Sequence, residues 1–522
     1  MMEMGALLPL QQNRTMRQTS RGASLPPPVG GLNFIDEWAN MDPRDALILK
    51  NIFPQASYVE LRKGFASHAT GMGAYPVETL MQWAGPSSAK LKAGVNGNVY
   101  DVTSAGAVGV AEVTGLSVNK WQSVNFKTAG GAFLVACNGT DAVRNYDGTT
   151  WTSPSITGSG LTSANLVNVA VHKSRLWFVE KDTTNAWFLP TSSIAGAATR
   201  QDLGTQFNLG GKLVAIGTIS QQDAGSGVDD YIVFISSLGQ FAVYQGTDPS
   251  SATTWAQVGV YRVGYPIGYR CTVDVGGDLG ILCSDGVIST FQAMKNDRSV
   301  AQRMAITNKI QQLFNTYQTA YGQNAGWMPL VYPKTNYVLF NVPFSSTQFV
   351  QLVMNIDTGA WCQFEDQNSV TWGLLGEDLY FGDANGTVWL ADSGYFDNNG
   401  PISGEIKTAW NYFGSRGENK FFTMARPNIQ VTGMPTVFFG YDVDFNNVTP
   451  TGSISSSAPL ETLWGTALWG TGVWGGQLTL NTEWQTPGTV GYCGAAHIVV
   501  SSAGSQFVLN SIDIQLQPGG PL

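Results

Sequence analysis

The chain carries few charged residues for its length. Of its 522 residues, 12% are Asp, Glu, Lys or Arg, against roughly 25% in ordinary soluble domains. Lys and Arg total 28 and Asp and Glu 37, which gives a net charge of −9. High-affinity nucleic-acid binding needs clustered cations that displace phosphate counterions. The composition therefore disfavours it, and leaves only transient, non-specific contact with double-stranded DNA.

Residues that commonly perform chemistry are also scarce. The three histidines, His68, His172 and His497, are far apart in sequence, and we expect each to be a hydrogen-bonding surface or turn residue. The five cysteines form no CxxC pair and are expected to be reduced core residues. No nucleophile elbow GxSxG and no Walker motif occurs. The sequence predicts neither an enzyme nor a bound cofactor.

One stretch has the spacing of a metal-binding loop. In "YDVDFNN", Asp442, Asp444 and Asn446 alternate. A calcium loop of the helix-loop-helix type also needs glycine where Asn447 stands and glutamate where Ser453 stands. We therefore interpret the alternation as polar residues on an exposed strand face, and predict no metal site.

Long apolar runs are absent as well. No run of 18 apolar residues exists, so no stable membrane insertion is expected. The first thirty residues hold Arg14, Arg17, Arg21 and "LPPP" but no long apolar core and no small-residue cleavage site. We interpret 1–30 as a flexible arm rather than a secretion signal.

The chain has abundant glycine and a recurring strand pattern. It contains 61 glycines, and from about Leu61 to Asp392 short apolar strands alternate with turns such as Asn-Gly, Asp-Gly and Thr-Gly. Glycine supplies the positive φ that tight hairpin turns require. Examples are "NGNVYDVT", "FLVACNGTDAVRNYDGTTW", "LGILCSDGVISTF" and "LVMNIDTGAWCQF". Many short antiparallel strands at regular spacing predict an all-β fold.

We favour a β-propeller over 61–400. About 330 residues at roughly 45 per four-stranded blade give about seven blades, or six once an inserted helix is removed, and we predict six. That helix is expected at about 297–321, amphipathic and capped by Asp297. Residues 31–60 are predicted as a docking segment and 401–522 as a β-rich assembly domain. The terminal segments together are expected to form an additional β-sandwich-like domain.

A tryptophan repeat lies within this last region. "LWGTALWGTGVWGG" places Trp464, Trp469 and Trp474 five residues apart, each followed by glycine. Neither a helix nor a strand gathers residues at this spacing on one side. Large flat side chains of this kind either pack under the same chain or complete an interface with another subunit. The three tryptophans are the candidate site residues of the sequence.

Two stretches carry a family resemblance. Gly30 to Phe65, "GGLNFIDEWANMDPRDALILKNIFPQASYVELRKGF", and the later order "DGVISTF", helix, "YVLFNVP", "LVMNIDTGAWCQFED" resemble tail nozzle proteins of short-tailed, podovirus-like bacteriophages. These proteins are related to packaged-DNA stabilisation proteins. The resemblance includes the Asp-Thr-Gly-Ala-Trp turn at Asp357 to Trp361.

The resemblance implies a virion structural protein without catalysis. Six copies would form a ring in the tail, below the portal and the adaptor, around a channel that retains or conducts the genome. The implied partners are the tail adaptor above and tail needle, fibre or spike proteins nearby, with assembly in the host cytoplasm. The tryptophan repeat would then anchor the head-to-tail contact or pin the terminal region to the propeller.

An alternative function remains open from the residues. A propeller could bind a cell-surface glycan or receptor through exposed aromatic side chains such as Trp151 and Trp187. A hydrolase would need acids from different blades, because Glu365 with Asp366 and Glu377 with Asp378 are sequence neighbours that point apart on a strand.

Overall fold

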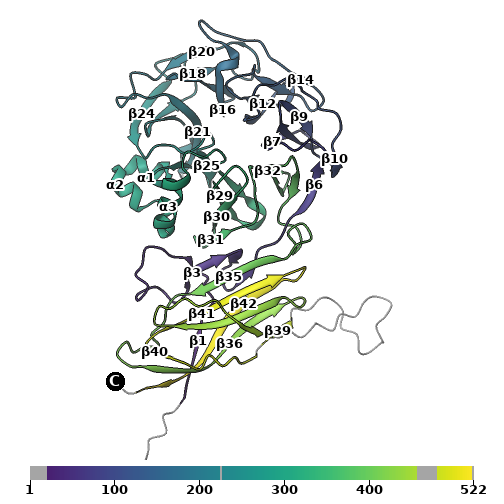
Figure 1. Ribbon diagram of the computed structural model, residues 1–522. Helices are drawn as coiled ribbons and strands as arrows, with labels where there is room; N and C mark the ends of the chain where they lie inside the picture. The colour runs from purple at the N-terminus through teal and green to yellow at the C-terminus, as the bar shows by residue number, and fades with distance from the viewer. Residues whose placement is uncertain (1–19, 224–225, 455–478, 482, 520–522) are drawn as a thin grey trace, which may run out of the picture.

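A computed structural model describes residues 20–223, 226–454, 479–481 and 483–519. It has two parts, a disc of small sheets and a smaller β-sandwich below it (Figure 1). The candidate residues Trp464, Trp469 and Trp474 lie outside the described residues. In the part of the chain that the structure describes, no helix is long and apolar enough to cross a bilayer.

The disc is a β-propeller whose blades follow one another along the chain. The first three blades are β7 (Val77–Ala84), β8 (Ala89–Val95) and β9 (Asn98–Asp101); then β11 (Gln122–Thr128), β12 (Gly131–Cys137), β13 (Arg144–Tyr146) and β14 (Trp151–Thr152); then β16 (Leu166–His172), β17 (Arg175–Glu180), β18 (Asn185–Phe188) and β20 (Thr199–Asp202). The next two are β21 (Leu213–Asp223), β22 (Ser226–Ser236), β23 (Gln240–Gly246) and β24 (Trp255–Arg262); then β25 (Thr272–Val275), β26 (Asp278–Cys283) and β27 (Gly286–Ser289). The last two are β28 (Met328–Tyr332), β29 (Tyr337–Pro343), β30 (Phe349–Asn355) and β31 (Trp361–Phe364); then β32 (Thr371–Leu375), β33 (Asp378–Gly382) and β34 (Val388–Leu390) with β6 (Ala66–Thr70).

Within the described residues these sheets make seven blades, so the predicted count of six is wrong. The prediction subtracted a blade for the inserted helix. In the structure the insertion lies between two blades, after β27 and before β28, and replaces neither. The ring closes where β6, from the N-terminal side, pairs antiparallel with β34 and aligns Ala69 with Val388.

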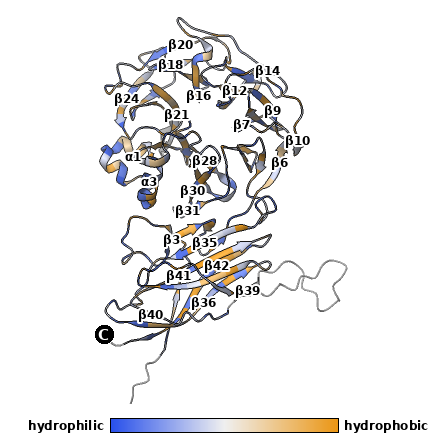
Figure 2. Ribbon diagram, viewed as in Figure 1, coloured by the Kyte–Doolittle hydropathy of each residue, from blue (hydrophilic) through white to orange (hydrophobic). Residues whose placement is uncertain are grey.

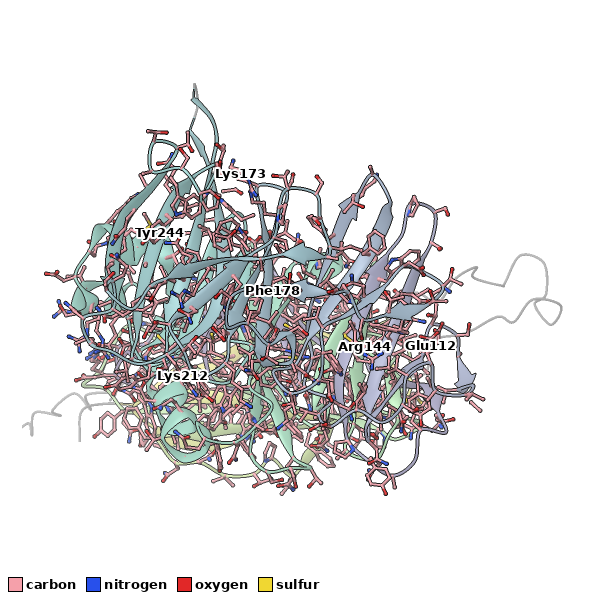
Figure 3. The ribbon with its side chains drawn as sticks, turned by 90° about the horizontal axis from the view of Figure 1, so that it is seen from above. Glu112, Arg144, Lys173, Phe178, Lys212 and Tyr244 are labelled. Atoms are coloured by element: carbon pink, nitrogen blue, oxygen red, sulfur yellow. The ribbon has the colours of Figure 1, made fainter. Side chains whose placement is uncertain are left out.

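Tight turns join the strands within each blade, as the sequence predicts. Between β8 and β9, Asn96 has φ +45° and Gly97 has φ +73°, a backbone that asparagine and glycine tolerate best. Short strands β10 (Gly106–Ala107), β15 (Ile156–Thr157) and β19 (Gly196–Ala197), with the 3-10 turn η1 (Ser163–Asn165), fill the connections. Seen edge-on, the long β21–β22 hairpin projects from the same face as Lys173, while Lys212 lies toward the other face (Figure 3).

The single predicted helix is a set of short ones. The structure has α1 (Thr290–Lys295), α2 (Arg298–Arg303), η2 (Asn308–Ile310) and α3 (Gln311–Tyr321), and a further 3-10 turn η3 (Pro333–Thr335). The break has a physical cause, because β27 is the outer strand of a three-stranded blade with an unpaired edge. The Ile306 amide donates to the Val287 carbonyl (2.9 Å), and Thr307 Oγ1 accepts from the Val287 amide (3.2 Å). The chain between α2 and η2 thus satisfies that edge instead of continuing a helix.

The second part combines both ends of the chain in a β-sandwich. One layer has seven strands: β1 (Arg21–Leu25), β4 (Ile52–Pro54), β5 (Val59–Leu61), β36 (Lys420–Val431), β39 (Thr479–Asn481), β40 (Thr489–Gly491) and β42 (Phe507–Pro518). The other contains β2 (Gly31–Leu32), β3 (Asp45–Lys50), β35 (Ile402–Thr408), β41 (Gly494–Ser502), β37 (Thr436–Val443) and β38 (Gly452–Ile454). We call this part the terminal domain.

Part of the predicted arm belongs to this domain. Residues Arg21–Leu25 form β1, which pairs antiparallel with β42 from Arg21 with Leu516 to Leu25 with Ile512. The prediction that 1–30 is a flexible arm is therefore wrong for these residues. Apolar side chains such as Ile429, Ile498 and Ile514 fill the core of the domain, and apolar residues mark strands such as β3 and β42 in Figure 2.

The two parts share one continuous sheet. Blade strands β28 to β31 continue through β2 and β3 into β35, β41, β37 and β38, which gives a ten-stranded sheet. At the junction Gly31 pairs with Trp361, and Lys50 pairs with Gln363. Gly31 has φ +75°, and a Cβ there would lie 2.4 Å from the Trp361 amide nitrogen. A glycine is therefore required where the terminal domain meets the propeller.

Candidate functional site: an exposed aromatic groove at the domain junction

An arginine occupies the propeller axis. From the segment before β25, Arg270 donates to Thr371 Oγ1 in β32 (2.9 Å), to Thr79 Oγ1 in β7 (3.1 Å) and to the Trp121 carbonyl before β11 (2.9 Å). These partners belong to three blades, and Arg270 comes from a fourth, so the guanidinium lies near the axis around which the blades are arranged. Hydrogen bonds from the Arg270 guanidinium thus connect several blades at the centre of the propeller.

A buried lysine in the propeller is partnered by two carboxylates. Lys92, whose side chain is 0% exposed, contacts Asp101 Oδ2 (2.8 Å) and Glu112 Oε1 (2.7 Å) and lies over the Tyr146 ring. Burial opposes the charge on this lysine, but the hydrogen bonds to Asp101 and Glu112 outweigh it, so the pKa of Lys92 is raised. One cation is shared by two carboxylates of the same region, so we assign the group a structural role as a buried ion cluster.

A second buried network crosses the terminal domain. Lys407 Nζ contacts Asp442 Oδ2 at 2.7 Å, and His497 Nε2 contacts Glu405 Oε1 at 2.9 Å. Burial opposes the charged imidazole, but the hydrogen bonds to Asp442 and Glu405 raise the pKa of His497 to about 9. His497 is 3% exposed, so the expectation of a surface or turn position is wrong for it. It is also wrong for His172, buried in β16. His68, half-buried in β6, contacts the Val102 carbonyl at 2.9 Å.

This network also explains the metal-like spacing. Asp442 is buried on β37, whereas Asp444 and Phe445 follow the end of the strand with φ of +49° and +62°. The change of backbone conformation breaks the alternation, so the expected exposed strand face does not form. Among the described residues no group of three or more His, Cys, Asp or Glu side chains is arranged to hold a metal ion.

A groove between the domains exposes aromatic side chains. It encloses about 370 Å³ and is bordered by the loop after β2, by Gln312 of α3 and by the terminal domain. Trp38 stacks on Phe445 with ring centroids 6.2 Å apart, and Phe445 packs against Trp410 at 5.2 Å. Trp410 is 3% exposed, Phe445 39% and Trp38 56%. We call this feature the Trp38 groove; its lining includes Ile35, Asp36, Glu37, Trp38, Trp410 and Phe445.

Hydrogen bonds hold the loop that carries Trp38. The Asn33 side chain accepts from the Ile35 and Asp36 amides and donates to Asp45 Oδ2 (2.7 Å). Lys309, just before α3, contacts Asp45 Oδ1 (2.6 Å). Arg416 donates to Asn40 Oδ1 (2.6 Å) from the other side. The exposed tryptophan is therefore presented by a fixed loop, which lowers the entropy cost of binding a partner.

Sequence reasoning missed this groove, although a signal was present. In "LNFIDEWANMD" the tryptophan stands among Asp, Glu and Asn, between the glycines that open the segment and Pro43. No strand or helix period accounts for it. A tryptophan in a polar, aperiodic stretch is a candidate for an exposed anchor.

The aromatics proposed for glycan binding are not exposed. Trp187 is 3% exposed, and its indole donates to Glu180 Oε2 (3.0 Å). Trp151 is half-buried against Tyr146 and donates to Glu112 Oε2 (2.8 Å). Both tryptophans therefore contribute packing and hydrogen bonds within the propeller. The five cysteines are free and buried, as expected; burial raises the pKa of Cys271 to about 12, so it is a poor nucleophile.

Comparisons with known proteins give no family. No protein-family model and no curated protein matches the chain. Similar solved structures include BBS1N in complex with ARL6DN (10% identity, TM-score 0.38, 63% of this chain and 97% of that one) and YCF48 bound to D1 peptide (10%, 0.33, 65% and 96%). A third is a glycoside hydrolase family 43 arabinoxylan arabinofuranohydrolase from Bacillus subtilis in complex with cellotetraose (10%, 0.24, 91% and 95%). At these values the likenesses carry no functional argument, and the propeller assignment rests on the strand topology.

Proposed function

We propose that this chain is a structural subunit of a bacteriophage tail, a nozzle protein that forms a six-membered ring below the portal and the adaptor. The ring would retain or conduct the genome. The role requires no catalysis and no cofactor. It requires a rigid body and contact surfaces for neighbouring subunits.

The junction between the domains carries this proposal. Gly30 to Phe65 and the turn at Asp357 to Trp361 belong to the two stretches that resemble nozzle proteins, and 292 positions separate Phe65 from Asp357. In the structure they meet, since Gly31 pairs with Trp361 in the shared sheet. The resemblance therefore falls on one physical unit that fixes the propeller to the terminal domain.

The other contacts fit a ring subunit. The axial position of Arg270 favours a genome channel between subunits rather than through one propeller. The low charge content suits protein contact, because charged residues are depleted in the cores of interfaces. The Trp38 groove supplies an exposed aromatic anchor of the kind enriched at interface centres.

Electron cryomicroscopy of the particle's tail tests this proposal. The expected result is six copies of the propeller and terminal domain around an axial channel beneath the adaptor. Copies attached as peripheral appendages would instead favour a receptor-binding role. Absence of the chain from the particle would overturn the nozzle function.

A further inference from the structure

The Trp38 groove has the features of a site for an apolar segment. Its aromatic rings run from buried Trp410 through Phe445 to exposed Trp38. Ile35 beside them is 47% exposed. Single exposed apolar residues are common, but a hollow lined by a stack of rings is typical of binding sites.

The rim of the groove adds a charge requirement. Asp36 accepts from the Asn33 side chain (2.8 Å) and Glu37 from the Asn40 side chain (3.3 Å). The neighbouring carboxylates differ, since Asp42 contacts Arg44 and Asp45 contacts Lys309. The carboxylates of Asp36 and Glu37 thus accept hydrogen bonds from side-chain amides, whereas those of Asp42 and Asp45 form ion pairs. A matching occupant would carry apolar side chains followed by positive charge.

The chain itself contains such a segment. Residues 1–19 lie outside the described residues, and their sequence places Leu7, Leu8 and Leu10 shortly before Arg14 and Arg17. Nineteen residues span at most about 65 Å. Within the part of the chain that the structure describes, the one cation in the groove lining, Lys407, is paired with Asp442. The segment therefore combines apolar side chains that can pack on the exposed rings with cations that can face Asp36 and Glu37, and its length lets it extend well away from β1.

The position of β1 favours a neighbouring copy over the same one. Arg21 pairs with Leu516, near the C-terminal end of β42. The chain enters β1 at the end of the terminal domain that lies away from the propeller (Figure 1). The Trp38 groove lies on the propeller side of the terminal domain, beside α3. An arm that starts from β1 would have to reverse along its own domain to fill its own groove.

We propose that residues 1–19 of one copy bind the Trp38 groove of the next copy around the ring. Leu7, Leu8 or Leu10 enters beside Trp38 and Phe445, and Arg14 and Arg17 face Asp36 and Glu37. Each copy gives one arm and offers one groove, which is a head-to-tail contact of the kind that closes rings. The inference rests on the proposed ring.

A disulfide trap in the full-length chain tests this contact. The native cysteines are all buried, so two introduced thiols can report proximity. One variant carries Leu10→Cys and the other Ile35→Cys, and the two are mixed under mild oxidation. The expected product is a covalent dimer of one of each. Phe421→Cys is the matched control partner, because Phe421 is 39% exposed on the far layer of the terminal domain.

Charge reversal supplies the second arm of the test. Asp36→Arg with Glu37→Arg should reduce trapping at least tenfold, and Arg14→Glu with Arg17→Glu in the other variant should restore it. Equal trapping with Phe421→Cys, or trapping unaffected by charge reversal, would overturn the inference. A disulfide formed within one chain carrying both Leu10→Cys and Ile35→Cys, with none between chains, would overturn the exchange between copies.

The tail micrographs separate this inference from the proposed function. A six-membered ring with empty Trp38 grooves would overturn the arm contact alone. Trapping between chains, together with absence of the chain from the particle, would support the contact and overturn the nozzle role.

Discussion

The propeller and the terminal domain are both built of β-strands, but along the chain they are assembled in opposite ways. A blade such as β21 to β24 uses residues 213–262 and pairs each strand with the next. In the terminal domain Arg21 pairs with Leu516, and Ala46 pairs with Thr408. The first is a series of local hairpins, and the second joins the two ends of the chain.

Because of this difference, the entropy cost of pairing the strands is small in the propeller and large in the terminal domain. Local hairpins cost little loop entropy, whereas pairing across hundreds of residues costs more and forms later. The propeller shortens the path, because closing β6 against β34 brings residues 66 and 390 together. The terminal domain then forms on a frame that already holds both its ends. The shared sheet at Gly31 should therefore be the most sensitive point of the molecule.

Substitution at this junction should have the largest effect. Gly31→Val places a side chain 2.4 Å from the Trp361 amide nitrogen and 2.5 Å from its carbonyl oxygen, at φ +75°. We expect a loss of about 3–5 kcal/mol. Urea unfolding measures the loss, and limited proteolysis should cut the terminal domain while the propeller resists. Gly22→Val is the control, since a Cβ at Gly22 meets no atom within 4 Å. Equal behaviour of both variants would contradict the role of the junction.

Removing the axial cation should damage the propeller instead. Arg270→Met leaves Thr79, Thr371 and the Trp121 carbonyl without their shared donor, which should cost about 2–4 kcal/mol. Hydrogen exchange should rise first in β7 and β32, with terminal-domain strands less affected. Arg262→Met, on the exposed outer strand β24, should change stability by less than about 0.5 kcal/mol. Faster exchange only in the terminal domain would refute the assigned role of Arg270.

Much of the propeller was predictable, because its information is local. Asn96 and Gly97 mark a hairpin, and the structure has a left-handed turn there. The blade count was not, because the sequence does not show whether the insertion at 290–327 replaces a strand or lies between blades. The broken helix has the same origin. Ile306 and Thr307 lie within the range predicted as helix, but in the structure they hydrogen-bond to the edge of β27. The sequence pattern does not show that β27 has an edge to be paired.

The candidate site was predictable only in part. The segment that contains Trp38 stood out by resemblance, yet the rings beside it come from residues 410 and 445, which no local pattern connects to it. For Asp442 a local pattern was present, but it led to a wrong prediction. Its spacing suggested an exposed face, whereas the positions of Lys407 on β35 and His497 on β41 make it part of a buried ion network. Pairings between distant strands decide both cases.

The ion network should make the terminal domain sensitive to pH. The pKa of His497 is raised to about 9 from its ordinary value of 6.5. A raised pKa stabilises the folded state fully below the unfolded value, and the contribution is lost as pH rises from about 6.5 through about 9. His497→Gln should therefore cost about 2–3 kcal/mol at pH 6 and almost nothing at pH 10. Unfolding by urea across this range measures the difference.

A matched variant on the propeller side controls the pH experiment. His68→Gln removes a histidine whose ring contacts the Val102 carbonyl rather than a carboxylate. Comparing the unfolding free energies of the two variants at pH 6 and pH 10 isolates the contribution of the carboxylate partners of His497. A difference for His497→Gln that stayed constant, or grew with pH, would show that the imidazole is not held in its charged form by Asp442 and Glu405.

We expect the smallest effect on stability from a substitution at Trp38. Comparing it with Trp361 distinguishes a tryptophan that stabilises the fold from one that contacts another copy of the chain. Trp361 is 1% exposed at the junction, so Trp361→Ala should cost about 3–5 kcal/mol. Trp38 is 56% exposed and stacks on Phe445, so Trp38→Ala should cost less than about 1 kcal/mol. Urea unfolding compares the two variants. If Trp38→Ala destabilised the chain as much as Trp361→Ala, the exposed ring would be part of the fold. If it left stability unchanged but abolished trapping between copies, its exposure would be explained by a partner that the isolated chain lacks.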